Sequence, residues 1–279
     1  MFWSLGVLTA LVATATAVVM VGRSRTAKRR SELFNGPFPR DWETILEHDL
    51  PPYAHLDAKL KVELKGLVNI FLEEKKFEGC GGLDISDEMR VLIAAEACLL
   101  LLNKKVKACY PSLDTILVYP HAFVARDRRL MESGGVILED DASARIGESW
   151  GSGAVVLAWD HVRGGASDFS DGHNVVLHEF GHQLDQGSGE ANGAPPLEQR
   201  TTYRSWGKIL GGEYKHLRDK VTRHKRDVLD FYGATNPAEF FAVATETFFE
   251  KPRELEKEHP ELFEELKKYY SLDPREWTE

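Results

Sequence analysis

The sequence predicts an α+β fold, mostly helical with a small sheet and preceded by one N-terminal transmembrane helix. Three observations carry this prediction: an uncharged apolar run at the N-terminus, several segments with apolar residues at helical spacing, and two short β-rich stretches between them. The helices flank the strands instead of alternating with them, which favours α+β over a βαβ arrangement. With 279 residues, 43% of them hydrophobic, the chain can bury a sizeable core in one main domain.

The first predicted element is a membrane anchor over residues 1–22, because the run from Phe2 to Gly22 carries no charged side chain. At about 1.5 Å per residue, such a helix is just long enough to cross a ~30 Å hydrocarbon core. Five basic residues follow within residues 23–30, and by the positive-inside rule they place the body of the chain in the cytoplasm. We therefore predict a single-pass inner-membrane protein whose main domain faces the cytoplasm.

Two alternatives compete with an anchor, a cleaved signal peptide and a purely cytoplasmic protein. Signal peptides carry their positive charge before the apolar stretch, whereas here it follows, which favours an uncleaved anchor. The three cysteines form no CxxC spacing and fit a reducing compartment. A net charge of −9 argues against direct binding of nucleic acid, which requires clustered positive charge.

Residues 23–55 follow as a basic flank and linker, since four prolines and Gly36 predict an irregular connection. Residues 56–272 form the predicted main domain. Ser86, followed by two acidic residues, is expected to cap its second helix. The expected helices cover residues 56–74, 86–102, 172–186, 197–220, 237–250 and 253–270, and the expected strands are Thr115–Tyr119 and Ala154–Trp159.

The most informative motif is HEFGH, within the predicted helix Asp171–Gln186 that Asp171 is expected to cap. His178 and His182 are four residues apart, so on a helix they are turned only ~40° from each other and separated by ~6 Å along its axis. Both imidazoles can then reach one Zn²⁺ ion, which accepts neutral histidine nitrogen and keeps a position open for water in catalytic sites. Glu179 is placed to take a proton from that water. Other divalent ions also suit such ligands.

A third ligand is expected from the stretch Asp230–Glu250. Asn236 can cap a helix there, which sets Glu239 in the first turn among apolar neighbours, where zinc would provide a counter-charge. The helix N-terminus alone is an alternative partner for this carboxylate. Glu246 shares the same helix face and is the rival ligand, or else it holds a histidine by its second nitrogen.

Asp185, one turn after His182, has two alternative interpretations. It can accept a hydrogen bond from an imidazole N–H and orient the ring, as carboxylates beside metal-bound histidines do. It is equally consistent with a solvated residue on the outer face of the helix.

These motifs resemble the Mlc titration factor A family of zinc peptidases, which are gluzincins. The matching segments include LPPYAHLDAKLKVELKGLVNIFLEEK, TILVYPHAFV, GESWGSGAVVLAW, HNVVLHEFGHQLD and YGATNPAEFFAVATETFF. The resemblance implies a zincin-like metallopeptidase domain in which His178, His182 and Glu239 bind zinc. It also implies that Glu179 is the general base and that the phenol of Tyr232 stabilises the oxyanion. Without the resemblance, Tyr232 is equally consistent with packing.

The resulting hypothesis is a zinc-dependent peptidase, aminopeptidase-like by resemblance, that hydrolyses peptide or protein substrates with a metal-activated water. The strand Ala154–Trp159 is a candidate edge on which an extended peptide would pair. The family name implies an alternative function, a regulatory binding protein that sequesters a transcription repressor. A metal-stabilised structural domain is the third alternative, and the remoteness of the cysteines from HEFGH argues against it.

Overall fold

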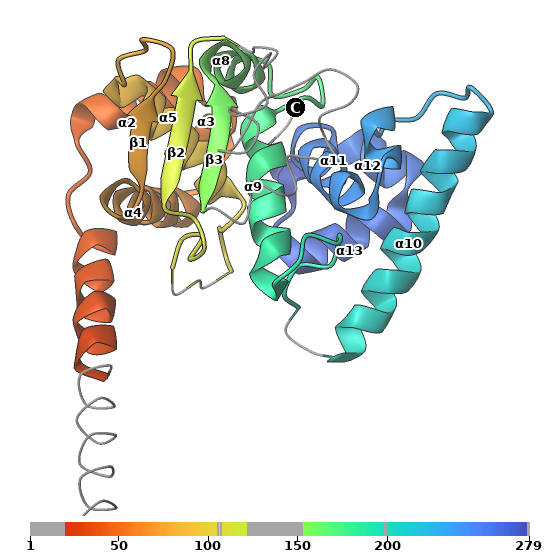
Figure 1. Ribbon diagram of the computed structural model, residues 1–279, viewed down its shortest axis with the longest axis horizontal. Coiled ribbons are helices and arrows are strands. Elements are labelled where there is room, and N and C mark those ends of the chain that lie inside the picture. Colours follow the sequence, from red (N-terminus) through yellow and green to blue (C-terminus); the bar gives the residue numbers. More distant parts are fainter. Residues whose placement is uncertain (1–19, 105, 107, 122–152, 198–199, 278–279) are drawn as a thin grey trace, which may run out of the picture.

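The computed structural model describes residues 20–104, 106, 108–121, 153–197 and 200–277. Figure 1 shows two halves, a sheet with its covering helices and a bundle of helices, with helix α9 (Val175–Asp185) between them. This arrangement is mostly helical with one small sheet, so the predicted α+β class is confirmed. Because α9 carries the HEFGH motif, the fold places that motif in the middle of the molecule.

The sheet has three parallel strands in the order β1-β2-β3. Strands β2 (Thr115–Tyr119) and β3 (Ala154–Ala158) match the two predicted strands, and β3 is an edge strand among those described. Strand β1 (Lys76–Gly79) was not predicted, because its four residues KFEG include two charged side chains and make no alternating apolar pattern.

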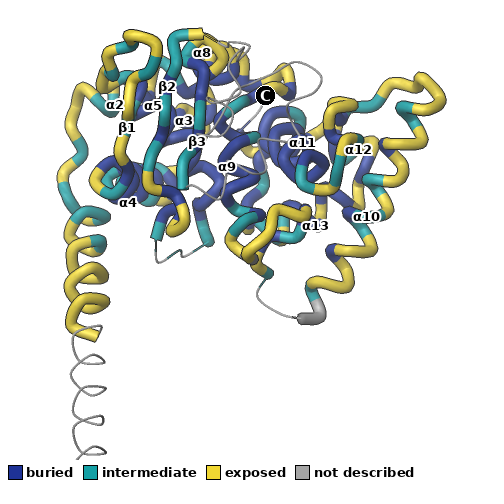
Figure 2. Tube along the Cα trace, in the orientation of Figure 1, coloured by how far each residue is buried: buried dark blue, intermediate teal, exposed yellow. Residues whose placement is uncertain are grey.

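The helices on the sheet side begin where capping residues allow. Ser86 accepts a hydrogen bond from the Met89 N–H, as predicted for the start of α5, and Asp57 caps α4 through the Leu60 N–H. Helix α5 is almost wholly buried, which agrees with its nearly continuous apolar sequence (Figure 2). The helices of this half are α2 (Arg40–Asp49), α3 (Pro51–His55), α4 (Ala58–Glu74), α5 (Asp87–Leu99) and α8 (Trp159–Ser167).

The prediction of an irregular connection before α4 is wrong. Residues 20–34 are helical, and α2 and α3 occupy most of the remainder. Pro39 precedes the first turn of α2 and Pro51 stands in the first turn of α3. A proline at those positions lacks only an N–H that no helical carbonyl would accept, so it starts a helix instead of breaking one.

The structure contradicts the predicted inner-membrane location. Within the described residues, no helix combines the length and the apolar character that crossing a bilayer requires. The predicted anchor falls on residues 1–22, and residues 1–19 lie outside the described part of the chain. Residues 20–34 form a helix that projects from the body in Figure 1, and the ion pairs of Arg29 with Glu73 and of Arg30 with Glu74 tie it to the end of α4. We withdraw the membrane assignment.

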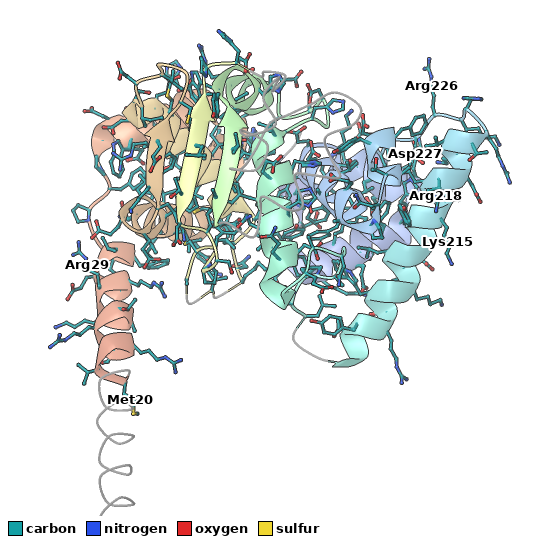
Figure 3. The ribbon with its side chains drawn as sticks, in the orientation of Figure 1. Met20, Arg29, Lys215, Arg218, Arg226 and Asp227 are labelled. Carbon is teal, nitrogen blue, oxygen red and sulfur yellow. The ribbon has the colours of Figure 1, made fainter. Side chains whose placement is uncertain are left out.

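In the second half of the molecule, the described elements are all helices. The outer edge is α10, whose Lys215 and Arg218 side chains point away from the body in Figure 3. The single helix predicted over residues 253–270 is two helices, because His259 and Pro260 end one and start the next. The elements are α10 (Arg200–Thr222), η3 (Phe231–Ala234), α11 (Pro237–Glu250), α12 (Pro252–Glu258) and α13 (Pro260–Tyr270).

Helices α9 and α11 pack closely, and this contact positions the site. Gly181 of α9 faces α11, and a Cβ there would be in ordinary van der Waals contact, 3.5 Å from the Cα of Ala242. On the sheet side of α9, Phe180 packs edge-on against Tyr110 with ring centroids 4.8 Å apart. Both faces of α9 are therefore fixed, one by α11 and the other by the aromatic core.

Candidate metal centre

Helix α9 presents His178 and His182 on the side that faces α11. Its N-cap is Asn174, whose Oδ1 accepts a hydrogen bond from the Leu177 N–H at 2.9 Å. The predicted cap, Asp171, is wrong: it lies in the preceding turn and accepts from the His173 N–H. Both residue types cap helices well, so the sequence alone did not separate them.

Helix α11 supplies the acid. The Asn236 Oδ1 accepts hydrogen bonds from the N–H groups of Ala238 and Glu239 at 2.9 and 3.0 Å, so the predicted cap is confirmed. Glu239 is thereby held in the first turn, and its Oε2 lies 3.0 Å from the Nε2 of His178 and 3.2 Å from the Nε2 of His182. Glu239 follows His178 by 61 positions and His182 by 57 positions, so the structure brings the three predicted ligands together from two distant segments.

The three side chains fit a tetrahedral metal ion. One ligand atom from each of His178, His182 and Glu239 lies within 4.8 Å of the other two. In tetrahedral zinc sites with bonds of 2.0–2.1 Å, neighbouring ligand atoms are roughly 3.3 Å apart. The two nitrogen–oxygen separations come close to that value, so a small adjustment of side chains suffices to accommodate the ion.

Glu246 holds the far side of the first histidine. Its Oε1 lies 2.6 Å from the Nδ1 of His178, which favours a proton on Nδ1 and leaves Nε2 directed at Glu239. Glu246 therefore does not join the ligand group; of the two roles predicted for it, the contact matches the one that orients the imidazole.

The charges at the site favour a cation. Burial by itself would raise the pKa of Glu239. Hydrogen bonds from both histidines outweigh burial and lower this pKa to about 2, so the carboxylate is ionised. Burial lowers the pKa of His182 below its ordinary value. Burial also opposes a charge on His178, yet the Glu246 and Glu239 carboxylates raise its pKa well above the ordinary range. An ionised carboxylate between two imidazole nitrogens is a setting in which a divalent ion can replace the protons on those nitrogens.

Glu179 lies beside these groups in a buried position. Burial, with further contributions from Glu239 and Glu246, raises its pKa to about 8 even though His178 opposes the shift. A carboxyl group with a pKa near neutrality can both accept and return a proton.

Tyr232 reaches the site from η3, the short helix that precedes α11. Its ring centroid lies 5.9 Å from that of His178, and 41% of the residue is exposed. Asp230 caps this turn by accepting from the Tyr232 N–H at 2.7 Å. The Tyr232 ring thus lies beside the His178 imidazole and is partly exposed to solvent.

Asp185 is buried and holds a loop. Its Oδ2 accepts a hydrogen bond from the Gly193 N–H at 2.6 Å, and the Gly193 carbonyl accepts from the indole N–H of Trp206. The prediction of a solvated Asp185 is therefore wrong. Its contact with the loop explains the burial, and a role in orienting an imidazole stays a prediction.

A second buried histidine forms a similar cluster between α10 and α12. The Nδ1 of His259 lies 2.7 Å from Glu213, and its Nε2 lies 2.9 Å from Asp227. With Glu258 and Asp227 it forms the other group in the described part of the chain that has metal-ligand spacing. Lys220, however, already places its ammonium 2.6 Å from Asp227. No short sequence pattern contains this cluster, since its members come from α10, from the loop that follows it and from the junction of α12 and α13.

Comparisons with known proteins agree with this geometry. The family model of the glucose-regulated metallopeptidases M90 matches residues 24–271. An uncharacterized protein of Synechocystis sp. is 44% identical over 247 residues, covering 88% of this chain and 89% of its own length. The Mlc titration factor A of Serratia proteamaculans is 31% identical over 84% of this chain and 87% of its own, and that of Klebsiella pneumoniae is 29% identical over 88% and 91%. The chain therefore belongs to the M90 metallopeptidase family, to which the predicted resemblance pointed.

Proposed function

We propose that this protein is a zinc peptidase whose ion is held by His178, His182 and Glu239. The observation that carries the proposal is the meeting of one carboxylate oxygen with two imidazole nitrogens at 3.0 and 3.2 Å. The chemistry of the donor set supports zinc, which combines histidine nitrogen with carboxylate oxygen in catalytic sites and leaves one position open. The ion would polarise the scissile carbonyl and make water more acidic.

The remaining steps belong to side chains of the protein. A carboxylate oxygen of Glu179 takes a proton from the attacking water and afterwards delivers it to the leaving amine. Its buried position next to the proposed ligand His178 supports this role. The phenol O–H of Tyr232 donates to the oxyanion that develops on the substrate, a role supported by its position beside His178.

The substrate is a peptide, as the metallopeptidase family implies. We propose aminopeptidase-like cleavage and a main domain spanning residues 56–272. An extended peptide would pair with β3, whose outer side carries no partner strand among those described. That strand precedes α8 and contacts α9, so a peptide there lies near the HEFGH helix.

The test is Glu179→Gln in the full-length chain, because the amide keeps the size of the side chain but cannot take a proton. We expect zinc content equal to wild type and hydrolysis of a peptide mixture reduced at least ~10²-fold, the usual contribution of a general base. Glu190→Gln, an exposed acid on the loop after α9, is the matched control and should leave both measurements unchanged. Wild-type turnover by the Glu179 variant would end the assignment.

A second function is suggested by the name of the relatives, Mlc titration factor A. It would be the binding of a transcription repressor without cleavage. Capture of a repressor by metal-free protein and by Glu179→Gln alike, with no peptide hydrolysis by wild type, would favour this function over the peptidase.

A further inference from the structure

Glu96 is a carboxyl group in the middle of the apolar helix α5 that the proposed reaction does not use. The residue is fully buried. Its Oε2 accepts a hydrogen bond from the Nδ2 of Asn174 at 2.7 Å, and its Oε1 has no hydrogen-bond partner among the described groups. Burying a carboxyl group with one partner is costly, so this position calls for an explanation.

Asn174 connects Glu96 to the start of the metal helix. Its Oδ1 caps α9 through the Leu177 N–H, while its Nδ2 donates to Glu96. Only one orientation of the amide satisfies both contacts, since oxygen must face the helix end and nitrogen must face α5. Gly165 of α8 closes the remaining side, because a Cβ there would lie 3.1 Å from the Cα of Asn174. Asn174 is therefore fixed on three sides.

Glu246 carries this connection to the metal centre. Its Oε2 accepts from the backbone N–H of Asn174 at 2.8 Å, and its Oε1 binds the Nδ1 of His178 at 2.6 Å. One carboxylate thus joins the backbone at the helix start to the imidazole one turn later. A shift of Asn174 would change the position of this carboxylate and, with it, the direction in which His178 points.

We infer that Glu96 is a positioning residue of the metal centre, which acts through Asn174 and Glu246 to keep the His178 imidazole aimed at Glu239. The inference rests on the proposed zinc site and extends it to a residue in the core of the sheet half. Carboxylates that orient metal-bound histidines typically change metal affinity 10–100-fold when removed. Glu96 lies two contacts further out, so its effect should fall near the lower end.

The charge state of Glu96 decides which substitution preserves its contact with Asn174. Burial raises its pKa to about 8, although the bond from Asn174 opposes the shift, so at pH 7 it is a neutral acid. A neutral acid offers a carbonyl oxygen to Asn174 and adds no charge beside the Glu246 carboxylate. Glutamine offers the same oxygen, whereas leucine fills the space and removes the acceptor.

The test measures zinc affinity of the full-length chain by competition with a chelator, together with the visible absorption spectrum of the Co²⁺ form. Glu96→Leu should weaken zinc binding about 10-fold and alter the Co²⁺ bands, which report the ligand geometry. Glu96→Gln should stay within about twofold of wild type on the same scale. Val91→Ala, buried elsewhere on α5, is the control for lost core packing and should leave both measurements unchanged.

A double-mutant cycle decides whether Glu96 acts through Glu246. If it does, Glu96→Leu has a smaller effect on zinc affinity in a Glu246→Gln background than in wild type. Equal effects in both backgrounds, or wild-type affinity of Glu96→Leu, would overturn the inference while leaving the zinc site intact. A wild-type chain that binds no zinc would overturn the site as well.

Asn174→Ser supplies an independent measurement should Glu96→Leu not fold. Serine caps a helix as well as asparagine does but has no donor that reaches Glu96. Weaker zinc binding with an intact helix supports the inference, and wild-type affinity contradicts it.

Discussion

Two histidines in this protein are each clamped between two carboxylates, yet they call for opposite interpretations. His178 lies between Glu246 and Glu239, and His259 lies between Glu213 and Asp227, with all four contacts at 2.6 to 3.0 Å. The difference is the next cation. At His259 the ammonium of Lys220 occupies the free side of Asp227, whereas Glu239 is met by a second imidazole, that of His182.

Ligand spacing alone therefore does not identify a metal site. Both clusters have suitable spacing, but the Lys220 ammonium already neutralises the His259 cluster and would repel a divalent ion. The His178 cluster instead combines two imidazoles with the ionised carboxylate of Glu239. We therefore expect the first cluster to be a metal centre and the second to be a structural network of ion pairs.

The largest expected difference between the two clusters is in zinc affinity. Glu239→Gln should weaken zinc affinity by more than the ~100-fold that loss of an outer partner costs, because a charged ligand is removed. Asp227→Asn, the equivalent change in the other cluster, should leave zinc affinity and a stoichiometry of one ion per chain unchanged. Titration with zinc against a chelator measures both. Equal losses of zinc affinity in the two variants would show that the two clusters do not differ as metal sites.

The next effect concerns pH and stability. Burial lowers the pKa of His259, but its hydrogen bonds with Asp227 and Glu213 raise it to about 9. A group whose pKa rises on folding stabilises the fold fully below its unfolded pKa of about 6.5, and this contribution disappears as pH rises through about 9. The contribution near pH 6 is on the order of 3 kcal/mol.

Urea unfolding of wild type and His259→Gln between pH 6 and 10 measures this contribution, because subtraction of the two curves isolates the imidazole. We expect the difference in the free energy of unfolding to shrink toward pH 10. A difference that is independent of pH would show that His259 is neutral and that the cluster is not a network of ion pairs.

The smallest expected effect concerns two helix caps, only one of which lies at the metal centre. Asn236→Ala should cost about 1 kcal/mol of stability and also weaken zinc binding, because the cap fixes the turn that carries Glu239. Asp57→Ala removes the cap of α4 at a similar cost in stability, far from the metal centre, and should leave zinc binding unchanged. Parallel losses of zinc affinity in both variants would mean that global stability, and not the turn, controls the site.

Local signals predicted which three side chains come together between α9 and α11. HEFGH placed two imidazoles on one helix face, and Asn236 with Pro237 marked where α11 begins, so the position of Glu239 followed from capping chemistry. The contact between α9 and α11 could not be derived, since it joins segments that lie far apart in the sequence.

Other features lacked a local signal or had a misleading one. The prolines of residues 23–55 predicted a linker, but proline also starts helices, and tertiary packing decided between the two. Glu96 was overlooked within the run VLIAAEACLLLL, although a single acid in a buried helix is unusual enough to be a signal. The His259 cluster joins residues 213–227 to residues 258–259, so no short pattern contains it.

We expect a single metal ion to bind between α9 and α11 and none to bind at His259. The most direct measurement is a crystal structure of the full-length chain grown with zinc, with anomalous scattering collected at the zinc absorption edge. We predict one peak at coordinating distance from the Nε2 atoms of His178 and His182 and from the Glu239 carboxylate. A peak confined to Asp227, Glu258 and His259, or zinc bound away from both clusters, would contradict the account.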